Sequence, residues 1–385
     1  MRFSSVATSL TLLSSVVAHP GHDITEEIVE RRAFLSSVKR TNLGHCAEKL
    51  AARGLTARNI ARRAAQVQYA RQKRSIKKRD SASVLATSHN DTDLEYTLNT
   101  DAATLFSGNN SCVLTPEVTQ GPYYVSGEYV RRNLIDGQEG VDIILDYQVI
   151  DIETCEPVPK VYLEMWHCNA TGVYSGIVAS GNGDSSDQSN IDNTFLRGIQ
   201  LTNEDGVAKF ESIFPGHYTS RATHIHLLVH TNATLFANNT LGSVNTASHV
   251  GQAFFDQDLI SAVEAVAPYN TNTQELTTNA EDGILGEETA TDGVDPLMEY
   301  TLLGDSVTDG LFAWMAFGIN TTQSSSITPA TFYYAEGGVA NPNSGGGGAG
   351  GAPPNGTAPS GGAPPNAASS DTAETSAAAT TPASC

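Results

Sequence analysis

The sequence predicts a mainly β protein: an antiparallel β-sandwich with few short helices, a basic helical propeptide before it and a disordered Gly/Pro/Ser-rich tail after it. In the predicted strands, apolar and polar residues alternate with a period near two, as they do in half-buried strands. These segments are residues 141–151, 160–168, 206–214 and 223–230. Turn-forming clusters separate them, as expected for a sandwich. One helix is expected around residues 256–269, with Asp256 as its N-cap and Pro268 near its end.

The amino-terminal part of the chain differs in composition from the rest. Residues 1–18 combine Arg2, a short apolar run and small residues, which is typical of a secretory signal peptide. Residues 19–79 are rich in Ala, Arg and Leu, which favour helix, and they end in a dibasic processing signal, Lys77-Lys78-Arg79. We therefore expect a basic helical propeptide over residues 19–79 and a linker over residues 80–100. A nucleic-acid-binding arm is the alternative interpretation of the basic segment.

The charge of the chain divides at the same place. Of the 22 Lys and Arg residues, 16 lie in residues 1–79, together with 5 of the 42 acidic residues. The remainder has 6 basic and 37 acidic residues, a net charge of −31. Such a surface repels nucleic acid and anionic membranes, and no later stretch approaches the ~20 apolar residues of a membrane span. We expect a secreted, extracellular protein without nucleic-acid or membrane partners.

The carboxy-terminal part has too little apolar surface to fold. From Gly337 to Cys385 the chain consists largely of Gly, Pro, Ala, Ser and Thr. We interpret residues 337–385 as a flexible stalk that could associate with a cell wall. One folded domain, residues 101–336, then remains, and it is long enough for a hydrophobic core.

Five cysteines constrain the disulfides, at positions 46, 112, 155, 168 and 385. Cys46 falls in the predicted propeptide and Cys385 ends the tail, so the domain keeps three. One disulfide and one free thiol is then the simplest count. Cys112 could pair with Cys155 or Cys168, and the sequence does not choose between them. Asn-x-Ser/Thr sequons predict surface glycans at Asn90, Asn109, Asn169, Asn232, Asn238, Asn320 and Asn355.

The first candidate functional residues lie in residues 215–230, PGHYTSRATHIHLLVH. His224 and His226 stand two apart on a predicted strand, so both imidazoles point to one face and can aim at one metal ion. Two exposed strand histidines are the alternative. Arg221 is one of only six basic residues in an acidic domain, which points to an anionic ligand or a charge-balancing role. The phenol of Tyr218 could become an anionic ligand if a trivalent metal lowered its pKa from about 10.

Several ordered motifs resemble those of the intradiol ring-cleavage dioxygenases, the non-haem iron(III) enzymes that include catechol 1,2-dioxygenases and protocatechuate 3,4-dioxygenases. Besides GHYTSRATHIH, the matching segments are TPEVTQGPYYV (115–125), YLEMWHCNATGVYSG (162–176), FLRGIQLTNEDGVAKFESIFPGHY (195–218) and HVGQAFFDQDL (249–259). The resemblance spans roughly residues 112–259 and is closest to the secreted single-domain branch of the family.

The resemblance implies a ligand set and a reaction. The family's ligands to Fe(III) fall on Tyr174, Tyr218, His224 and His226, and its conserved arginine falls on Arg221. In this interpretation Tyr218 also accepts a proton from the catechol, and Arg221 stabilises negative charge on the ring. The aromatic diol is cleaved with O2 between its two hydroxylated carbons to give a cis,cis-muconic acid, without an organic cofactor. Tyr123 and Tyr124 either line the substrate pocket or have a packing role.

The remaining histidines and arginines are assigned other roles. We expect His217 and His230 not to bind metal, and His167 and His249 to form structural hydrogen bonds. Arg132 and Arg197 are the cations left to meet a carboxylated substrate. With so few, simple catechols or hydroxyquinols are favoured over protocatechuate.

Three rival interpretations fit parts of the same pattern. A cupin also places His-x-His on a strand, but with a carboxylate a few residues later, and here no acidic residue follows His226 until Asp256. A copper oxidase would need His19 as an exposed amino terminus. The rival from another functional class is a non-catalytic secreted β-sandwich that binds carbohydrate or a cell-wall polymer.

Overall fold

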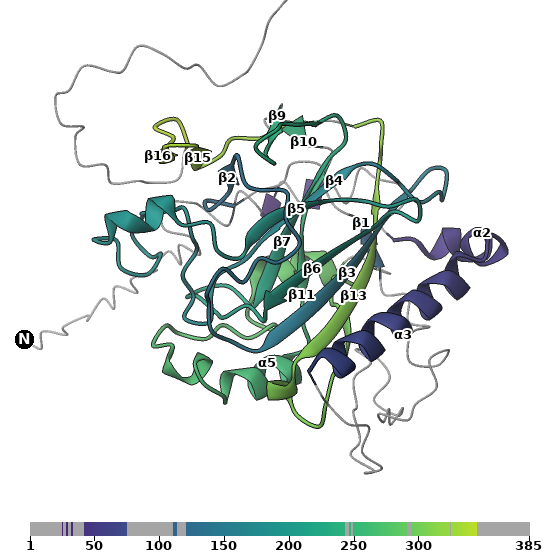
Figure 1. Ribbon diagram of the computed structural model, residues 1–385, viewed down its shortest axis with the longest axis horizontal. Helices are drawn as coiled ribbons and strands as arrows, with labels where there is room; N and C mark the ends of the chain where they lie inside the picture. The colour runs from purple at the N-terminus through teal and green to yellow at the C-terminus, as the bar shows by residue number, and fades with distance from the viewer. Residues whose placement is uncertain are drawn as a thin grey trace, which may run out of the picture.

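The computed structural model describes residues 42–74, 111–113, 121–242, 246–247, 249–290, 294–323 and 325–344, together with residues 25, 28, 29, 32 and 33. The predicted signal peptide, the dibasic site, the linker and most of the tail lie outside these residues. The mainly β prediction is confirmed, because strands form the framework and the helices are short apart from α3 (Figure 1). None of the helices among the described residues has the length and apolar content needed to cross a bilayer.

Two sheets form the sandwich. The first has the order β1-β13-β3-β6, with β12 also paired to β13, and the second has the order β11-β7-β4-β5. The strands of the first sheet are β1 (Ser111–Val113), β3 (Asp142–Asp151), β6 (Val207–Ile213), β12 (Glu299–Leu302) and β13 (Leu311–Ile319). Those of the second are β4 (Tyr162–Trp166), β5 (Arg197–Leu201), β7 (His224–His230) and β11 (His249–Phe254). The strands expected from alternation correspond to β3, β4, β6 and β7.

Smaller elements complete the fold. Short strands pair as β16-β15-β2, β10-β14 and β8-β9. Their bounds are β2 (Val125–Ser126), β8 (Thr234–Leu235), β9 (Leu241–Gly242), β10 (Thr246–Ala247), β14 (Ser325–Ser326), β15 (Thr331–Tyr334) and β16 (Gly337–Ala340). The helices are α2 (Ala47–Ala52), α3 (Leu55–Lys73), α5 (Gln257–Glu264) and α6 (Gly283–Thr289), with single 3-10 turns η1 (Gly44–Cys46), η2 (Gln188–Asp192), η3 (Tyr269–Thr271) and η4 (Val307–Asp309). The helix expected over 256–269 is α5, which ends at Glu264, before Pro268.

Strand alternation decides which residues enter the core and which face the candidate site. On β7, Ile225, Leu227 and Val229 join the main hydrophobic core between the two sheets. The intervening residues, including His224 and His226, therefore point to the opposite face of the second sheet. The functional side chains thus lie on the outer face of one sheet, and the core holds that sheet in place from behind.

The antiparallel prediction needs one correction. β13 pairs with β3 in parallel, with Leu311 opposite Ile143, and β1 also pairs with β13 in parallel. The other pairs in the two main sheets are antiparallel. A parallel pair needs a long crossover connection, and here well over a hundred residues separate β3 from β13. Local alternation carries no information about a partner so distant in the chain.

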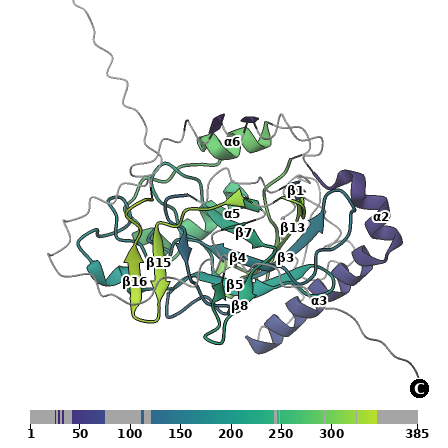
Figure 2. The same cartoon turned by 90° about the horizontal axis from the view of Figure 1, so that it is seen from above.

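The basic amino-terminal segment packs against the domain. Helix α3 lies along the outer face of the first sheet, beside β3 and β13 (Figures 1 and 2). Its Val67 and Ala70 are buried against Ile144, Phe312 and Trp314 of that sheet. The helix predicted within residues 19–79 is therefore present, and it covers apolar surface that the sheet alone would expose.

Ion pairs fix the same contact. Arg62 donates two hydrogen bonds, of 2.8 and 3.1 Å, to the fully buried carboxylate of Asp146. Arg58 pairs with Asp205 at 2.9 Å, and Arg74 donates to Asp142 at 3.0 Å. The basic amino-terminal segment and the acidic domain therefore form complementary surfaces within one fold.

The cysteine prediction is wrong. Cys46 forms a disulfide with Cys155, at a sequence separation of 109 residues, and Cys168 is a buried free thiol. The expectation fails because it places Cys46 in a segment that leaves the protein. Since the disulfide joins that segment to the domain, cleavage at Lys77-Lys78-Arg79 would not by itself release it.

The predicted start of the tail is also wrong. Residues 337–340 form β16, which pairs antiparallel with β15, and the described chain continues to Ser344. Two of these four residues are glycines, and Val339 is largely exposed, so the segment buries little apolar surface and its composition resembles that of a linker. Backbone hydrogen bonds to a neighbouring strand are enough to order them.

Candidate metal centre

Four side chains predicted as metal ligands meet on the outer face of the second sheet. His224 and His226 come from β7, Tyr218 from the approach to that strand, and Tyr174 from the loop after β4. All four are at most 3 % exposed. The ring centroids of Tyr174 and Tyr218 lie 5.5 Å apart, and those of His224 and His226 lie 4.7 Å apart. Residues distant in sequence therefore form one buried cluster.

The two histidines aim their Nε2 atoms at one place. Those atoms lie 3.1 Å apart, and the hydroxyl of Tyr218 lies 3.4 Å from Nε2 of His224. Nδ1 of His224 donates a hydrogen bond of 2.6 Å to the carbonyl oxygen of Ala222. This bond fixes the tautomer that carries its lone pair on Nε2, the arrangement found in metal-binding histidines. The ring of His226 stacks on Trp166 at 4.8 Å, which holds its orientation.

The donor set fits a trivalent iron ion. The buried hydroxyl of Tyr174 has no hydrogen-bond partner among the described residues, and a bound metal ion would satisfy its oxygen. Two imidazole nitrogens and two phenol oxygens suit iron, and phenolates balance the charge of Fe(III). Burial raises the pKa of both Tyr174 and Tyr218 well above the usual range, and the nearby positive charge of Arg221 offsets only part of this rise. A metal cation is the additional charge that would ionise these phenols.

Gly121 lies beside the four predicted ligands, where a side chain would be strained. Its φ is +70°, and a Cβ at this position would come within 3.2 Å of Cε1 of His226. A side chain here would adopt a strained backbone conformation and would need the imidazole to shift by a few tenths of an ångström. Gly121 opens the GPYY motif, so this close approach accounts for the glycine in that motif.

Arg221 lies in the site but does not stand alone. It is fully buried; its Nε donates to Asp282 at 2.8 Å and its Nη2 donates to Gln252 at 2.5 Å. The second carboxylate oxygen of Asp282 accepts hydrogen bonds from the backbone N–H groups of Ile284 and Leu285, in the first turn of α6. Sequence reasoning missed Asp282, because nothing in the sequence links an N-cap aspartate to an arginine 61 residues away.

The two tyrosines of the GPYY motif separate. The ring of Tyr123 lies 4.8 Å from that of Tyr174 and 6.1 Å from that of Tyr218. Tyr124 instead packs on Trp166, and its hydroxyl donates to Glu164 at 3.4 Å. The structure therefore brings Tyr123 beside the two tyrosines predicted as ligands and directs the hydroxyl of Tyr124 into a neighbouring polar network.

The other histidines are held by protein groups. His230 contacts Glu164 at 2.7 Å, and His217 contacts Glu264 at 2.8 Å. His167 bridges the carbonyl of Cys168 and the hydroxyl of Ser212, and Nε2 of His249 accepts from the backbone N–H of Asn320. The contacts of His167 and His249 are the structural hydrogen bonds predicted for these two residues.

A second cluster of metal-ligating residue types is found among the described residues, formed by His45, Cys46 and Cys155. Both sulfurs of that cluster are used in the disulfide, so it is not a metal site in this structure.

Comparison with known proteins identifies the fold family. Residues 119–276 match the family model described as Dioxygenase. An intradiol ring-cleavage dioxygenase from Tetranychus urticae shares 30 % sequence identity over 55 % of this chain and 96 % of its own, with a TM-score of 0.44. The chain belongs to the intradiol ring-cleavage dioxygenase family.

Two curated members of the family are also similar. Catechol 1,2-dioxygenase of Acinetobacter baylyi is 28 % identical over 109 residues, 27 % of this chain and 32 % of that protein. Catechol 1,2-dioxygenase 1 of Acinetobacter lwoffii is 26 % identical over 137 residues, 30 % of this chain and 42 % of that protein. The chain thus matches less than half the length of these two family members.

Proposed function

We propose that this protein is a non-haem Fe(III) dioxygenase that cleaves catechol-type diols with O2 between the hydroxylated carbons, giving cis,cis-muconic acids. The observation that carries the proposal is the convergence of Tyr174, Tyr218, His224 and His226 in one buried cluster, with the two Nε2 atoms 3.1 Å apart. Membership of the intradiol family supports it.

The protein side chains have separable roles in this proposal. Bound Fe(III) would ionise the two phenols and offer positions for both oxygens of a catecholate. His224 and His226 would each offer a neutral imidazole nitrogen to the metal ion. For His224, the hydrogen bond from Nδ1 to Ala222 leaves Nε2 as the ligand atom. Tyr218, as a phenolate, would accept a proton from the substrate at its phenolate oxygen.

Arg221 supplies the positive charge. Its guanidinium is held rigidly by Asp282 and Gln252, so it need not reorganise when negative charge develops on the substrate ring. A preorganised, buried charge of this kind is an effective means of stabilising a transition state. The ring of Tyr123, beside both tyrosines, provides an aromatic surface against which a catechol could stack.

Two arginines bear on the substrate class. Arg197 lies 3.8 Å from Glu128, and Arg132 lies 3.1 Å from Glu211. Both of the cations considered for a carboxylated substrate are thus paired within the protein. This supports simple catechols or hydroxyquinols as substrates.

We also propose that the protein is secreted. The Cys46–Cys155 disulfide is consistent with an oxidising compartment, and the signal-peptide pattern of residues 1–18 points the same way. Association of the tail with a cell wall remains a proposal from composition alone.

The deciding experiment is a visible spectrum with metal analysis, before and after anaerobic addition of catechol. We expect about one iron per chain and a red-brown tyrosinate-to-iron band that shifts when catechol binds. Tyr218→Phe should weaken the band. A protein that stays colourless after iron loading would refute the proposal and favour a non-catalytic binding module, which a carbohydrate-binding assay would then test.

A further inference from the structure

Tyr174 differs from the other predicted ligands in how the fold holds it. His224 and His226 are fixed by the hydrogen-bond ladders of β7 with β4 and β11. Tyr218 forms an isolated bridge with Arg221. Tyr174 lies in the loop between β4 and η2, outside any strand. A ligand in a loop needs another means of fixing its backbone if its phenol is to keep one position.

Two buried asparagines supply that means. The backbone N–H of Tyr174 donates to Oδ1 of Asn182 at 2.7 Å. Nδ2 of Asn182 donates in turn to the carbonyl oxygens of Tyr174 and Ile177, at 2.8 and 2.9 Å. Nδ2 of Asn190 donates to the same two carbonyls, at 2.9 and 2.8 Å. Asn182 is 2 % exposed and Asn190 is 7 % exposed, so these bonds are shielded from water.

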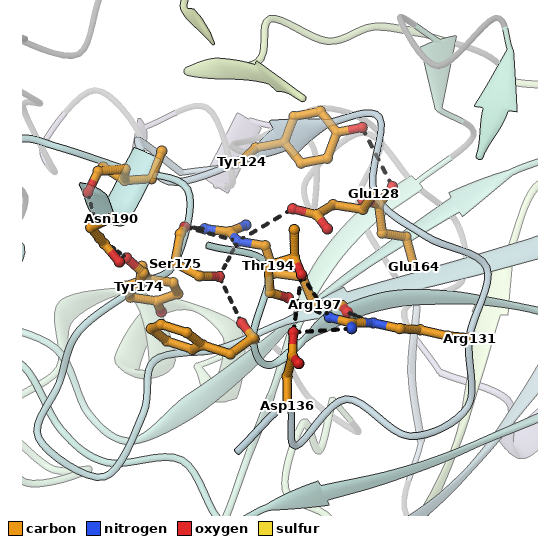
Figure 3. Close-up of polar contacts among 12 residues, drawn as sticks. Tyr124, Glu128, Arg131, Asp136, Glu164, Tyr174, Ser175, Asn190, Thr194 and Arg197 are labelled. Carbon is orange, nitrogen blue, oxygen red and sulfur yellow. Dashed lines mark hydrogen bonds and ion pairs between the residues drawn. The ribbon is translucent and has the colours of Figure 1, made fainter. Parts of the chain in front are cut away.

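Arg197 holds the next residue of the loop. Its Nε and Nη2 donate to the carbonyl oxygen of Ser175, at 3.0 and 2.7 Å, and Nε also reaches the Ser175 hydroxyl. Figure 3 shows the guanidinium between Ser175 on one side and Glu128 on the other. Its central carbon lies 5.9 Å from the centre of the Tyr174 ring. Arg197 therefore holds the backbone of Ser175 and also lies over the aromatic ring of Tyr174.

From these contacts we infer that Asn182, Asn190 and Arg197 are positioning residues that fix Tyr174 for metal binding. The inference rests on the proposed function, in which Tyr174 is an iron ligand. Each backbone polar group of Tyr174, and the carbonyl of Ser175, has a buried side-chain partner. An outer partner of this kind affects the metal through the ligand that it orients, and its loss typically costs 10- to 100-fold in metal affinity or activity.

The test compares iron binding by four variants with the wild type. Asn182→Ala removes the partner of the Tyr174 N–H. Asn190→Ala is milder, because both carbonyls keep Asn182 as a donor, so this variant should fold. Tyr174→Phe serves as the benchmark for loss of the phenolate. Asn203→Ala is the matched control, since its Oδ1 accepts two backbone hydrogen bonds in the distant turn before β6.

The readouts are iron affinity in competition with a chelator, the tyrosinate band per bound iron, and the melting temperature of the metal-free protein. We expect Asn182→Ala to lose about 10- to 100-fold in iron affinity and to resemble Tyr174→Phe in its spectrum. Asn190→Ala should lie between it and the wild type, and Asn203→Ala should match the wild type.

Two negative results are distinguishable. If the wild type has no tyrosinate band, the proposed function fails. If the wild type has the band and both asparagine variants keep its intensity and the wild-type iron affinity, the positioning role is wrong and the asparagines only stabilise the loop. A lower melting temperature with an unchanged spectrum and unchanged iron affinity would likewise overturn the positioning role.

Discussion

The Cys46–Cys155 disulfide should contribute strongly to stability. In the chain-entropy model, closing a loop of 109 residues in the unfolded chain stabilises the folded protein by about 5 kcal/mol. Real disulfides usually deliver somewhat less, so we expect Cys46→Ala/Cys155→Ala to lower the free energy of unfolding by about 3–5 kcal/mol. The double substitution avoids leaving an unpaired thiol in the cluster around Ile150 and Ile152.

Urea denaturation followed by tryptophan fluorescence can measure this loss and locate it. The chain has two tryptophans. Trp314 lies beneath α3, with the guanidinium of Arg63 5.4 Å from its ring centre, whereas Trp166 stacks on His226. In a Trp166→Phe background the remaining signal reports the docking of α3 on the sheet.

Reductant provides the matched control. Reducing the wild type should reproduce the loss seen in the double variant, and the double variant itself should not respond. A double variant whose unfolding free energy stays within about 0.5 kcal/mol of the wild type would refute the reasoning, since surface substitutions alone cause changes of that size.

Three further predictions follow from other contacts. A protease that cuts at Lys77-Lys78-Arg79 should yield two fragments that separate on a denaturing gel only after reduction; separation without reductant would show that the disulfide is not formed. Asp282→Asn leaves the buried Arg221 without its carboxylate, and urea denaturation should show a loss of about 3–5 kcal/mol; a change below about 1 kcal/mol would contradict this. Burial raises the pKa of Glu128 to about 8, so the folded protein holds this proton more tightly than the unfolded chain does. The protonated carboxyl therefore contributes its full stabilisation below the ordinary carboxyl pKa, and this stabilisation is lost as the pH rises through 8. In the wild type, the free energy of unfolding should fall by on the order of a few kcal/mol between pH 5 and 8 because of this carboxyl. Glu128→Gln should remove that fall, and a variant with the wild-type pH profile would show that Glu128 does not cause it.

The histidine pair shows what local pattern predicts well. The alternation in residues 223–230 gives both the strand and the shared face of His224 and His226, because side-chain direction in a strand depends only on parity. The motifs around Tyr174 and Tyr218 indicated the other two predicted ligands through resemblance. The structure then brought all four together.

Arg221 shows where local pattern stops. Its rarity in an acidic domain marked it as a functional residue, but its partners Asp282 and Gln252 come from distant segments. The same holds for Asn182 and Asn190, which fall in a Gly- and Ser-rich stretch that predicts only a turn. Their role depends on which backbone groups the folded loop leaves unpaired, and that is a tertiary property.

The sequence by itself determined the fold class, the main alternating strands, the histidine pair and the opposite net charges of residues 1–79 and of the rest of the chain. These properties depend on neighbours a few residues apart or on composition. Only the tertiary structure decided that β13 lies parallel to β3, that Cys46 pairs with Cys155, and that α3 covers the sheet with its arginines on Asp146 and its neighbours. These contacts join residues from 84 to 168 positions apart, and over such distances the packing of the whole chain selects the partner, whereas local pattern does not.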